Sequence, residues 1–361
     1  MSKKLIFKCP INGLSFGNVG VNILYQLYLK DIDTCIIPHG QQADLSTFDK
    51  LPTDFKKWVE ASISQRFKKI KKETPCLNLW HINGCENKTS DRNVLYTFYE
   101  TTQPTEEEVN LVNLYDETCF SSTHALNVFK ESGASRVNSI PLGIDPSFKK
   151  ETHARPEKIH FGLVGKWEKR KHTAKIIQAW AKQYGNNHNY ELSCLVNNKF
   201  LSNEQVLSEK ARALRGETYG NINFLPWLPL NSQVNALMNS IDIDLSGMSG
   251  AEGWNLPAFN ATALGKWSIV LNATSHKDWA TKENSVLVEP NGKESIVDEI
   301  FFQKDFAFNQ GEKYTFAEDD LIEAMSHAEK LCLEENEEGK KLKDKFNYSN
   351  TTDQILDVCC A

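Results

Sequence analysis

The residues most able to do chemistry lie in a glycine-rich segment between a predicted buried strand and a predicted helix. It reads Ser246-Gly-Met-Ser-Gly-Ala-Glu252-Gly-Trp-Asn-Leu-Pro257 and continues through Asn260 to Gly265. Glycines let backbone N–H groups approach a ligand, and Pro257 suits the first turn of a helix, whose N-terminus favours anions. We expect the Glu252 carboxylate and the Asn260 amide to face one cavity and to bind hydroxyl groups. The alternative is that Glu252 caps the helix and Asn260 lies at the surface.

A second candidate segment, Gly165-Lys-Trp-Glu-Lys-Arg-Lys171-His172, holds four cations in six residues. It follows another predicted buried strand and precedes a helix. Lysine and arginine side chains near a helix start can neutralise a diphosphate, which carries about two negative charges. The alternative is a solvated, charged turn, which is the usual state of a charge run.

A third segment, Asn12-Gly-Leu-Ser-Phe-Gly17-Asn-Val-Gly20, follows the first predicted strand and leads into a helix predicted from residue 20. Its glycine spacing matches neither the dinucleotide-binding fingerprint nor the P-loop, which ends in Gly-Lys-Ser/Thr. It predicts either a loop that approaches an anionic ligand or a tight strand-to-helix turn.

Strand-like apolar runs alternate with helix-period segments along most of the chain, which predicts an α/β fold with parallel sheets. Predicted strands cover 5–9, 34–37, 76–80, 94–98, 117–121, 136–140, 158–164, 191–196, 221–225, 241–246, 268–272 and 285–288. Predicted helices cover 20–30, 54–70, 104–114, 123–132, 173–184, 231–239 and 257–264. In open parallel sheets, ligands bind outside the carboxyl ends of the strands, where the three candidate segments lie.

A polar seam with two prolines, residues 145–157, precedes a fresh buried strand and indicates a domain boundary. We expect one α/β domain at 1–150 and a second at 151–340. A C-terminal helix at 341–361 is expected to cross back to the first domain.

Composition sets the broad class. The chain has 361 residues, 40% hydrophobic and 24% charged, with a formal net charge of −6. This fits a globular protein of two domains. No apolar run approaches the ~20 residues of a membrane-spanning helix, and the start lacks the apolar stretch of a secretory signal. The nine cysteines form no Cys-x-x-Cys pair, which favours reduced thiols in a cytoplasmic protein and disfavours a metal site.

One basic segment stands out from this acidic background. Residues 56–72 carry seven cations and a single acidic residue, Glu60. The cations are Lys56, Lys57, Arg66, Lys68, Lys69, Lys71 and Lys72. On the predicted helix, Trp58, Val59, Ser62, Ile63, Phe67 and Ile70 form an apolar stripe that faces the core. The basic face is a solvated helix end, a peripheral contact to anionic membranes, or a contact to DNA.

Taken together, these motifs resemble the retaining GT-B glycosyltransferases of the group that contains sucrose synthase, glycogen synthase and bacterial mannosyltransferases ("glycosyl transferases group 1"). The resemblance rests on Glu252-Gly253-Trp254-Asn255-Leu256-Pro257 with Ala261 to Gly265, and on Gly165-Lys166 with Lys171. Pro141-Leu-Gly-Ile-Asp145 and Ser121-Ser122 with Gly133 extend it into the first half. The implied fold is GT-B, with two Rossmann-like domains facing a cleft.

The resemblance implies a donor site for a nucleotide sugar. Lys166 and Lys171 would hold the diphosphate, Glu252 the sugar, and the backbone of Gly253, with Trp254, Asn255 and Leu256 beside it, the phosphate end. The family's second glutamate, which binds the ribose, is replaced here by Asn260. His172 stands where the family has glycine.

In the first domain, the resemblance implies that Gly17 lies near the leaving diphosphate and that His81 and Glu100 lie near the acceptor. Transfer would follow a front-face path in which the leaving phosphate assists deprotonation of the acceptor, without a metal ion. The only cofactor expected is the co-substrate itself, a UDP- or GDP-sugar.

The sequence therefore predicts a retaining glycosyltransferase whose acceptor hydroxyl belongs to a glycan or a lipid-linked sugar. Three alternatives stay open: transfer to hydroxymethylated bases of phage DNA, a nucleotide-sugar epimerase, and a non-catalytic sugar-nucleotide-binding protein.

Overall fold

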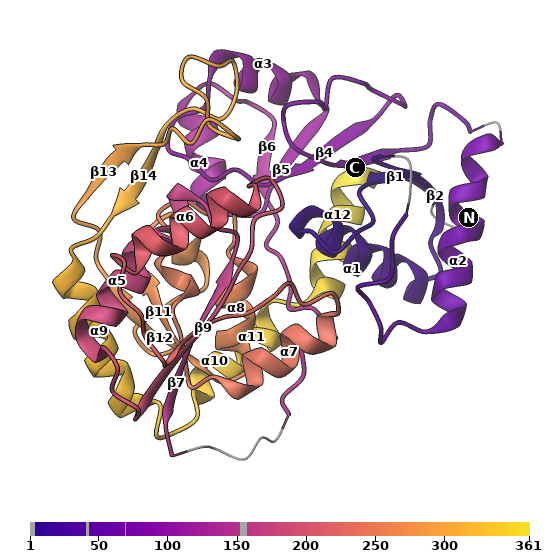
Figure 1. Ribbon diagram of the computed structural model, residues 1–361. Coiled ribbons are helices and arrows are strands. Elements are labelled where there is room, and N and C mark those ends of the chain that lie inside the picture. Colours follow the sequence, from indigo (N-terminus) through magenta and orange to yellow (C-terminus); the bar gives the residue numbers. More distant parts are fainter. Residues whose placement is uncertain (1–3, 41–42, 69, 152–156) are drawn as a thin grey trace.

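The computed structural model describes residues 4–40, 43–68, 70–151 and 157–361. Within them the chain forms two lobes, each organised around its own six-stranded sheet of parallel strands (Figure 1). The predicted α/β class with two parallel sheets is confirmed. Residues 152–156, which belong to the predicted seam, lie outside the described residues.

The first lobe is built on strands β1 to β6, in the order β2-β1-β3-β4-β5-β6. The strands are β1 (Lys4–Cys9), β2 (Asp33–Pro38), β3 (Cys76–Leu79), β4 (Asn93–Thr97), β5 (Glu117–Phe120) and β6 (Val137–Ser139). The helices between them are α1 (Ser15–Leu29), α2 (Thr53–Ser64), α3 (Glu106–Leu114) and α4 (Thr123–Glu131).

The second lobe is built on strands β7 to β12, in the order β12-β11-β10-β7-β8-β9. The strands are β7 (Ile159–Gly165), β8 (Tyr190–Val196), β9 (Ile222–Phe224), β10 (Ile243–Asp244), β11 (Trp267–Leu271) and β12 (Ser285–Val288). The helices are α5 (Thr173–Tyr184), α6 (Asn203–Ala213), α7 (Asn231–Ser240), α8 (Leu256–Ala263) and α9 (Glu318–Leu331).

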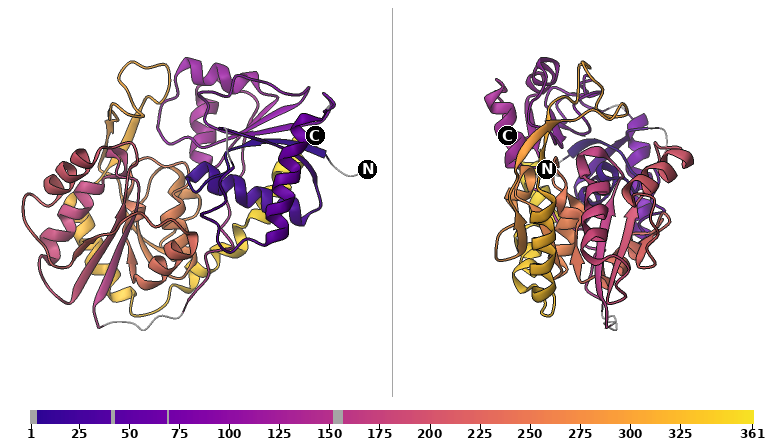
Figure 2. Two further views of the ribbon diagram at one scale, coloured as in Figure 1. Left: turned by 45° about the vertical axis from the view of Figure 1, so that its right-hand side comes forward. Right: turned by 60° about the vertical axis from the view of Figure 1, so that its left-hand side comes forward.

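Three short to medium helices end the chain: α10 (Glu337–Lys340), α11 (Leu342–Lys345) and α12 (Tyr348–Cys360). Helix α12 lies against α1 of the first lobe, as Figures 1 and 2 both show. Thr351 Oγ1 donates to the Pro141 carbonyl at 2.8 Å, and Lys30 Nζ pairs with Asp353 at 2.9 Å. The end of the chain therefore covers the first lobe after the second lobe is complete.

Apolar packing joins the lobes. Most strands are near-continuous apolar runs, as expected where helices cover both faces of a parallel sheet. The largest buried cluster contains first-lobe residues of β1 and α1 together with Trp254 and Phe259 of the second lobe. Phe346 packs edge-on against both rings, at 5.4 and 5.8 Å between centroids. The lobes share one core at this point, which fixes how their sheet edges face each other.

A hairpin of strands β13 (Gly292–Ser295) and β14 (Glu312–Thr315) leaves the second lobe after β12 and extends toward α3 (Figures 1 and 2). We call residues 290–316 the interlobe hairpin. Thr105 Oγ1 donates to the Ala307 carbonyl at 2.6 Å, and the Asn309 N–H donates to Glu108 at 2.9 Å. The hairpin thus connects the lobes a second time.

Two predicted helix boundaries are wrong. Helix α1 begins at Ser15 rather than residue 20, so Gly17 and Gly20 lie inside it. A Cβ on Gly20 would stand 2.7 Å from the Pro10 carbonyl oxygen, so the missing side chains let the helix start close to β1. Helix α2 ends at Ser64 instead of continuing to residue 70. The crowded like charges from Arg66 onward disfavour a helix, because i,i+4 neighbours would repel.

The predicted apolar stripe is also wrong at its C-terminal end, because the helix has already ended there. Val59 and Ser62 are buried as expected, but Phe67 lies in a short 3-10 turn and is 79% exposed.

Four further elements were not predicted at all: α6, the interlobe hairpin, α9 and α10. No helix in the described ranges is both long and apolar enough to cross a bilayer. All nine cysteines are free thiols, and eight of them are buried.

The contact between Gly143 and the start of α12 yields a stability prediction. A Cβ on Gly143 would lie 2.3 Å from the Tyr348 backbone nitrogen and 2.4 Å from the Asn347 carbonyl carbon. Because backbone atoms cannot turn aside, we expect Gly143→Ala to lower the free energy of unfolding by about 1–3 kcal/mol. Urea denaturation measures it. Gly220→Ala is the control, since Gly220 has no atom within 4 Å of an added Cβ; equal midpoints for the two variants would contradict the prediction.

Candidate functional site

The cation-rich segment after β7 folds as a tight turn between the strand and α5. It contains a short 3-10 helix, Lys169–Lys171, and closes at His172, whose φ of +55° is left-handed. Glycine adopts this conformation without strain, which accounts for the glycine of the resembling family. Here the His172 Nε2 donates to the Tyr314 carbonyl of the interlobe hairpin at 2.8 Å. The histidine therefore attaches this turn to the hairpin.

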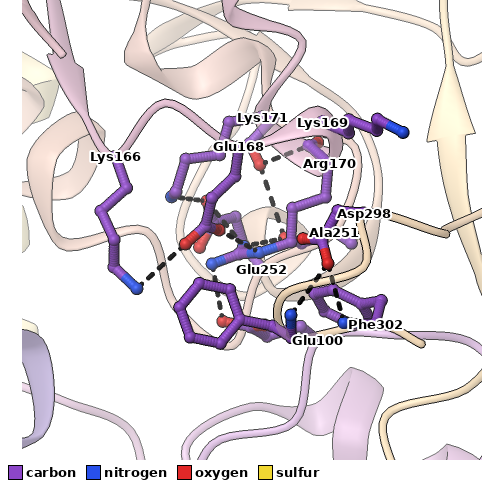
Figure 3. A network of polar contacts seen from close by, with 12 residues as sticks. Glu100, Lys166, Glu168, Lys169, Arg170, Lys171, Ala251, Glu252, Asp298 and Phe302 are labelled. Atoms are coloured by element: carbon purple, nitrogen blue, oxygen red, sulfur yellow. Dashed lines mark hydrogen bonds and ion pairs between the residues drawn. The ribbon is translucent and has the colours of Figure 1, made fainter. Parts of the chain in front are cut away.

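The buried guanidinium of Arg170 is the centre of the site (Figure 3). Its Nε lies 2.7 Å from Glu168, its Nη2 3.0 Å from Glu100, and its Nη1 3.3 Å from Glu252. Nη1 also donates to the Ala251 carbonyl at 2.5 Å. Glu100 comes from the end of β4 in the first lobe, so one side chain joins the cation turn, the glycine-rich loop and the opposite lobe.

Glu252 is nine-tenths buried and carries its charge there. It pairs with Lys171 Nζ as well as with Arg170. Burial by itself would raise its pKa, but the Lys171 and Arg170 cations outweigh burial and lower the pKa to about 2. The predicted juxtaposition of Glu252 with the cation turn is present, with the carboxylate ionised at neutral pH.

The other two carboxylates differ from each other. Burial also raises the pKa of Glu168, yet Arg170, Lys171 and Lys166 together hold it below its ordinary value. Glu100 has a raised pKa, because burial and the neighbouring Glu252 and Glu168 charges exceed the attraction of Arg170. Glu100 is thus the member of the cluster that takes up a proton most readily.

Lys166 extends from the same turn toward the first lobe. Its Nζ pairs with Glu168 at 2.9 Å and stands over the Phe301 ring of the interlobe hairpin at 4.7 Å, while the side chain stays 40% exposed. His81, which follows β3, faces it across the lobes. The protein atoms around it and the Lys166 charge lower the pKa of His81, although the ring is solvent-exposed, so it is mainly neutral at pH 7.

The glycine-rich loop places backbone groups, rather than its large side chains, toward the site. Gly253 faces the first lobe: its carbonyl accepts from Ser121 Oγ at 2.6 Å, and a Cβ would lie 2.8 Å from Phe98 Cβ. The Trp254 side chain is 3% exposed and packs in the shared core, as does the half-buried Leu256. Any ligand contact of these two residues is therefore through the backbone.

Asn255 shapes the start of α8. It has a left-handed φ of +67°, its Oδ1 accepts from the Ala258 N–H at 3.4 Å, and its Nδ2 lies 2.9 Å from His276 Nε2. His276 is fully buried and its Nδ1 donates to the Leu271 carbonyl at 2.9 Å, so Nε2 is the acceptor. The side chain of Asn255 therefore caps α8 and holds the loop before it.

Asn260 lies one turn into α8 and is 6% exposed. Its Oδ1 has no hydrogen-bond partner among the described residues. A buried amide oxygen without a partner costs free energy, and a ligand that donated to it would remove that cost. Asn260 is therefore neither at the surface nor satisfied by the fold.

Gly17 lies in the first turn of α1, close to the preceding Asn12. A Cβ there would meet the Asn12 side-chain oxygen at 2.3 Å and the Asn12 carbonyl oxygen at 2.4 Å. The absence of a side chain is thus already required by the β1–α1 turn. Proximity to a diphosphate stays a prediction for this residue.

The basic segment is divided between two ends of α2. Gln65 Nε2 donates to Asp33 at the start of β2, at 3.1 Å, which places Arg66, Lys68, Lys71 and Lys72 at the amino edge of the first sheet. Lys56 and Lys57 lie in the first turns of α2. Lys69 lies outside the described residues. Residues of the site, by contrast, follow the carboxyl ends of β3, β4 and β7.

A cavity of about 740 Å3 borders the site without containing it. Trp167, Glu168, Lys169, Thr173, Asn198 and Asp298 are among its lining residues. Lys166, Lys171, Glu252 and Asn260 do not line it, so the candidate site is the region between the lobes. No cluster of three or more His, Cys, Asp or Glu side chains in the described part of the chain is arranged to hold a metal.

Sequence reasoning singled out Lys166, Lys171, Glu252 and Glu100, and the structure brings all four together around Arg170. It did not single out Arg170 or Glu168. The sequence offers no signal for them, because a buried arginine within Lys-Arg-Lys looks the same as its exposed neighbours. The one indication is Glu168 itself, an acidic residue among the cations of this segment, because it indicates that one of those cations has a carboxylate partner.

No protein-family model and no curated protein sequence matches the chain. Solved structures do match over nearly full length. HepE from Anabaena, in complex with UDP and glucose, is 12% identical with a TM-score of 0.68 and covers 99% of both chains. Sucrose-phosphate synthase from Thermosynechococcus elongatus is 13% identical with a TM-score of 0.66, covering 99% of this chain and 98% of its own. WaaG, a glycosyltransferase of lipopolysaccharide biosynthesis, is 13% identical with a TM-score of 0.62, covering 98% and 99%. The chain has the GT-B fold.

The two buried histidines make stability depend on pH. Burial lowers the pKa of both His172 and His276 to about 4. The unfolded chain binds these protons near pH 6.5 and the folded protein only near pH 4, so stability present at pH 7 is lost as pH falls between them. At pH 5 we expect each histidine to cost about 2 kcal/mol.

His172→Gly tests this, because glycine suits the left-handed backbone and removes the proton-binding group. The variant should lose less stability than the unsubstituted protein when thermal unfolding is compared at pH 7 and pH 5. His188→Ala, at an exposed histidine, is the control. An identical pH dependence in all three proteins would contradict the assignment.

Proposed function

We propose that this GT-B chain is a glycosyltransferase that moves a sugar from a nucleotide-sugar donor to an acceptor hydroxyl. The observation that carries the proposal is the convergence of Lys166, Lys171 and the ionised Glu252 beside the glycine-rich loop that leads into α8. Two flexible cations and a helix N-terminus suit a diphosphate, and a carboxylate beside them suits sugar hydroxyls.

Each donor group has a matching place. Lys166 and Lys171 hold the diphosphate together with the backbone N–H groups that follow Gly253. Glu252 accepts hydrogen bonds from the sugar, and the Oδ1 of Asn260 accepts one from the ribose. The unpartnered state of that oxygen supports its role, although an amide lacks the added strength of a charged acceptor. HepE in complex with UDP-glucose, similar in fold at 11% identity, supports a UDP-sugar as the donor.

Donor binding exchanges one set of ion pairs for another. Lys171 now pairs with Glu252, and Lys166 with Glu168. A diphosphate that takes both lysines frees Glu252 to face the sugar, while Arg170 keeps Glu252 and Glu168 in place. The carboxylates thus act as counter-ions for the cations until the donor arrives.

We propose retention of configuration without a metal ion. Glu100, Glu168 and Glu252 all pair with Arg170, so none of these three is a free base opposite the sugar. The leaving phosphate, held by Lys166 and Lys171, is then the base that receives the acceptor proton. The lysines and the α8 N-terminus supply the positive charge that the departing diphosphate needs. The acceptor is a glycan or a lipid-linked sugar.

The first experiment is a panel of UDP-glucose, UDP-galactose, UDP-N-acetylglucosamine and GDP-mannose. We expect one donor to raise the melting temperature and to release its nucleoside diphosphate in a coupled assay, with an anomeric proton signal that shows retention. We expect Lys166→Ala to raise the donor KM by about 10–100-fold, because the substitution removes one or two charge-assisted contacts to the diphosphate. Lys277→Ala, at an exposed lysine, is the control. Indifference to every donor would contradict the proposal.

The same assay separates the other candidates. Conversion of the donor sugar without an acceptor would favour an epimerase, and donor binding without any turnover would favour a non-catalytic binding protein.

Asn260→Glu gives a second test of the donor site. A buried carboxylate without a partner destabilises the free protein, whereas a bound ribose would give it two charge-assisted hydrogen bonds. We expect a lower melting temperature without donor and a larger donor-induced rise than in the unsubstituted protein. Asn260→Ala is the matched control and should lose the rise. If glutamate changes neither quantity, the ribose does not bind at this position.

A further inference from the structure

Aromatic and imidazole rings stand at the carboxyl ends of four adjacent strands of the first sheet. His39 follows β2, Phe16 lies in the first turn of α1 after β1, Trp80 and His81 follow β3, and Phe98 follows β4. Because the sheet order is β2-β1-β3-β4, the rings lie side by side along one edge. We call these five residues the aromatic row.

The rings are in direct contact. His39 stacks on Trp80 with centroids 4.5 Å apart and planes 25° apart. Phe16 lies 4.3 Å from the His81 ring and stacks on Phe98 at 4.1 Å. Phe16 and Trp80 complete the connection at 6.2 Å. The rings therefore form one contiguous cluster, in which the accessible faces belong to His39, Trp80, His81 and Phe98.

One end of the aromatic row meets the proposed donor site. Phe98 is the side chain that a Cβ on Gly253 would strike, and His81 lies near Lys166, the proposed diphosphate ligand. The other end, at His39 and Trp80, leads away from the donor loop toward β2. An acceptor lying on the row would therefore present its near end to the sugar to be transferred.

The row is neither fully buried nor loosely held. Phe98, Trp80 and His39 are half-buried and His81 is exposed, whereas Phe16, which links them, is buried at 7% exposure. A chain of hydrogen bonds fixes the far end: His39 Nε2 donates to Asn78 at 2.7 Å, Asn78 donates to the Tyr115 hydroxyl at 2.8 Å, and that hydroxyl donates to the Cys85 carbonyl at 2.5 Å. The rings are thus organised before any ligand binds.

We propose that the aromatic row is the acceptor site and that it binds a sugar ring, so that the acceptor hydroxyl belongs to a glycan. This rests on the proposed function. The apolar C–H face of a sugar packs on an aromatic ring, and its hydroxyls find acceptors in the neutral imidazoles, at Nδ1 of His39 and at His81. In the transfer, the acceptor oxygen bonds to the anomeric carbon as the carbon–phosphate oxygen bond breaks. The acceptor proton passes to the leaving diphosphate.

The position of the basic segment favours a glycan over DNA. Bases also stack on aromatic rings, but a nucleic acid needs cations along its backbone. Arg66, Lys68, Lys71 and Lys72 lie at the amino edge of the sheet, and the row lies at the carboxyl edge. Six residues of strand separate the two edges by about 20 Å. These four cations and the aromatic row are therefore on two surfaces, and a phosphate backbone held by one does not follow the other.

Saturation-transfer NMR with methyl glycosides of glucose, galactose, mannose and N-acetylglucosamine tests the row directly, without donor. We expect signal transfer from the C–H face of one glycoside, and at least a tenfold loss of affinity in Trp80→Ala. Trp80→Phe, which keeps a ring, should restore most of it. Phe67→Ala removes an exposed ring outside the row and is the control.

Turnover separates this inference from the proposed function. With the donor identified by the panel, the acceptor KM should rise at least tenfold in Trp80→Ala, while the donor-induced rise in melting temperature is kept. Glycoside binding that Trp80→Ala leaves unchanged would overturn the acceptor site. Transfer only to an oligonucleotide with hydroxymethylated bases would also overturn it, with the glycosyltransferase itself intact. If every donor fails but the glycoside still binds the row, the proposed function fails and the sugar site stands.

Discussion

The buried guanidinium of Arg170 is the constraint to which the rest of the site conforms. A buried charge is tolerated only when partners surround it, and removing one partner from such a cluster leaves another charge uncompensated. Its three carboxylates come from the turn after β7, the glycine-rich loop before α8 and the end of β4 in the opposite lobe. The folds of all three segments, and the approach of the two lobes, must therefore agree within hydrogen-bond distance. The shared core at Phe346 and the interlobe hairpin hold the lobes in that arrangement from either side.

Charge neutrality within this cluster explains how a site rich in cations stays stable without a ligand. Lys166, Arg170 and Lys171 balance Glu100, Glu168 and Glu252, so the free protein buries no net charge there. Without the three carboxylates, the cations proposed to bind a diphosphate would repel one another across a few ångströms. A donor must therefore compete with the protein's own carboxylates. Arg170 pairs with all three and is the most deeply buried cation of the turn, which makes it the structural member, while the more exposed Lys166 is free to change partners.

The sequence was sufficient for the sheets and for most of the donor loop, for reasons visible in particular residues. Near-continuous apolar runs mark strands covered on both faces, and Pro257 after a glycine-rich stretch marks the start of α8. The sequence was not sufficient where the burial of a residue depends on a partner that is distant along the chain. Arg170 is buried because Glu100, seventy residues earlier, reaches it from the other lobe, and no local pattern records that contact. The start of α1 was missed because Gly17 and Gly20 read as a loop, although their lack of side chains is what lets the helix begin close to β1.

The two facing edges of the lobes have complementary chemistry. The second lobe gathers ionised groups at Lys166, Lys171 and Glu252, whereas the first lobe presents stacked rings and histidines held neutral by their surroundings. This division is useful for a transfer between a charged donor and a neutral, hydroxyl-rich acceptor. An anionic acceptor would compete with the diphosphate for the lysines, and the negative faces of the aromatic rings would not attract it. The first-lobe cations Arg66, Lys68, Lys71 and Lys72, which could attract a polyanion, are instead at the far edge of the sheet. The placement of charge, rather than its total, therefore separates donor from acceptor in this fold.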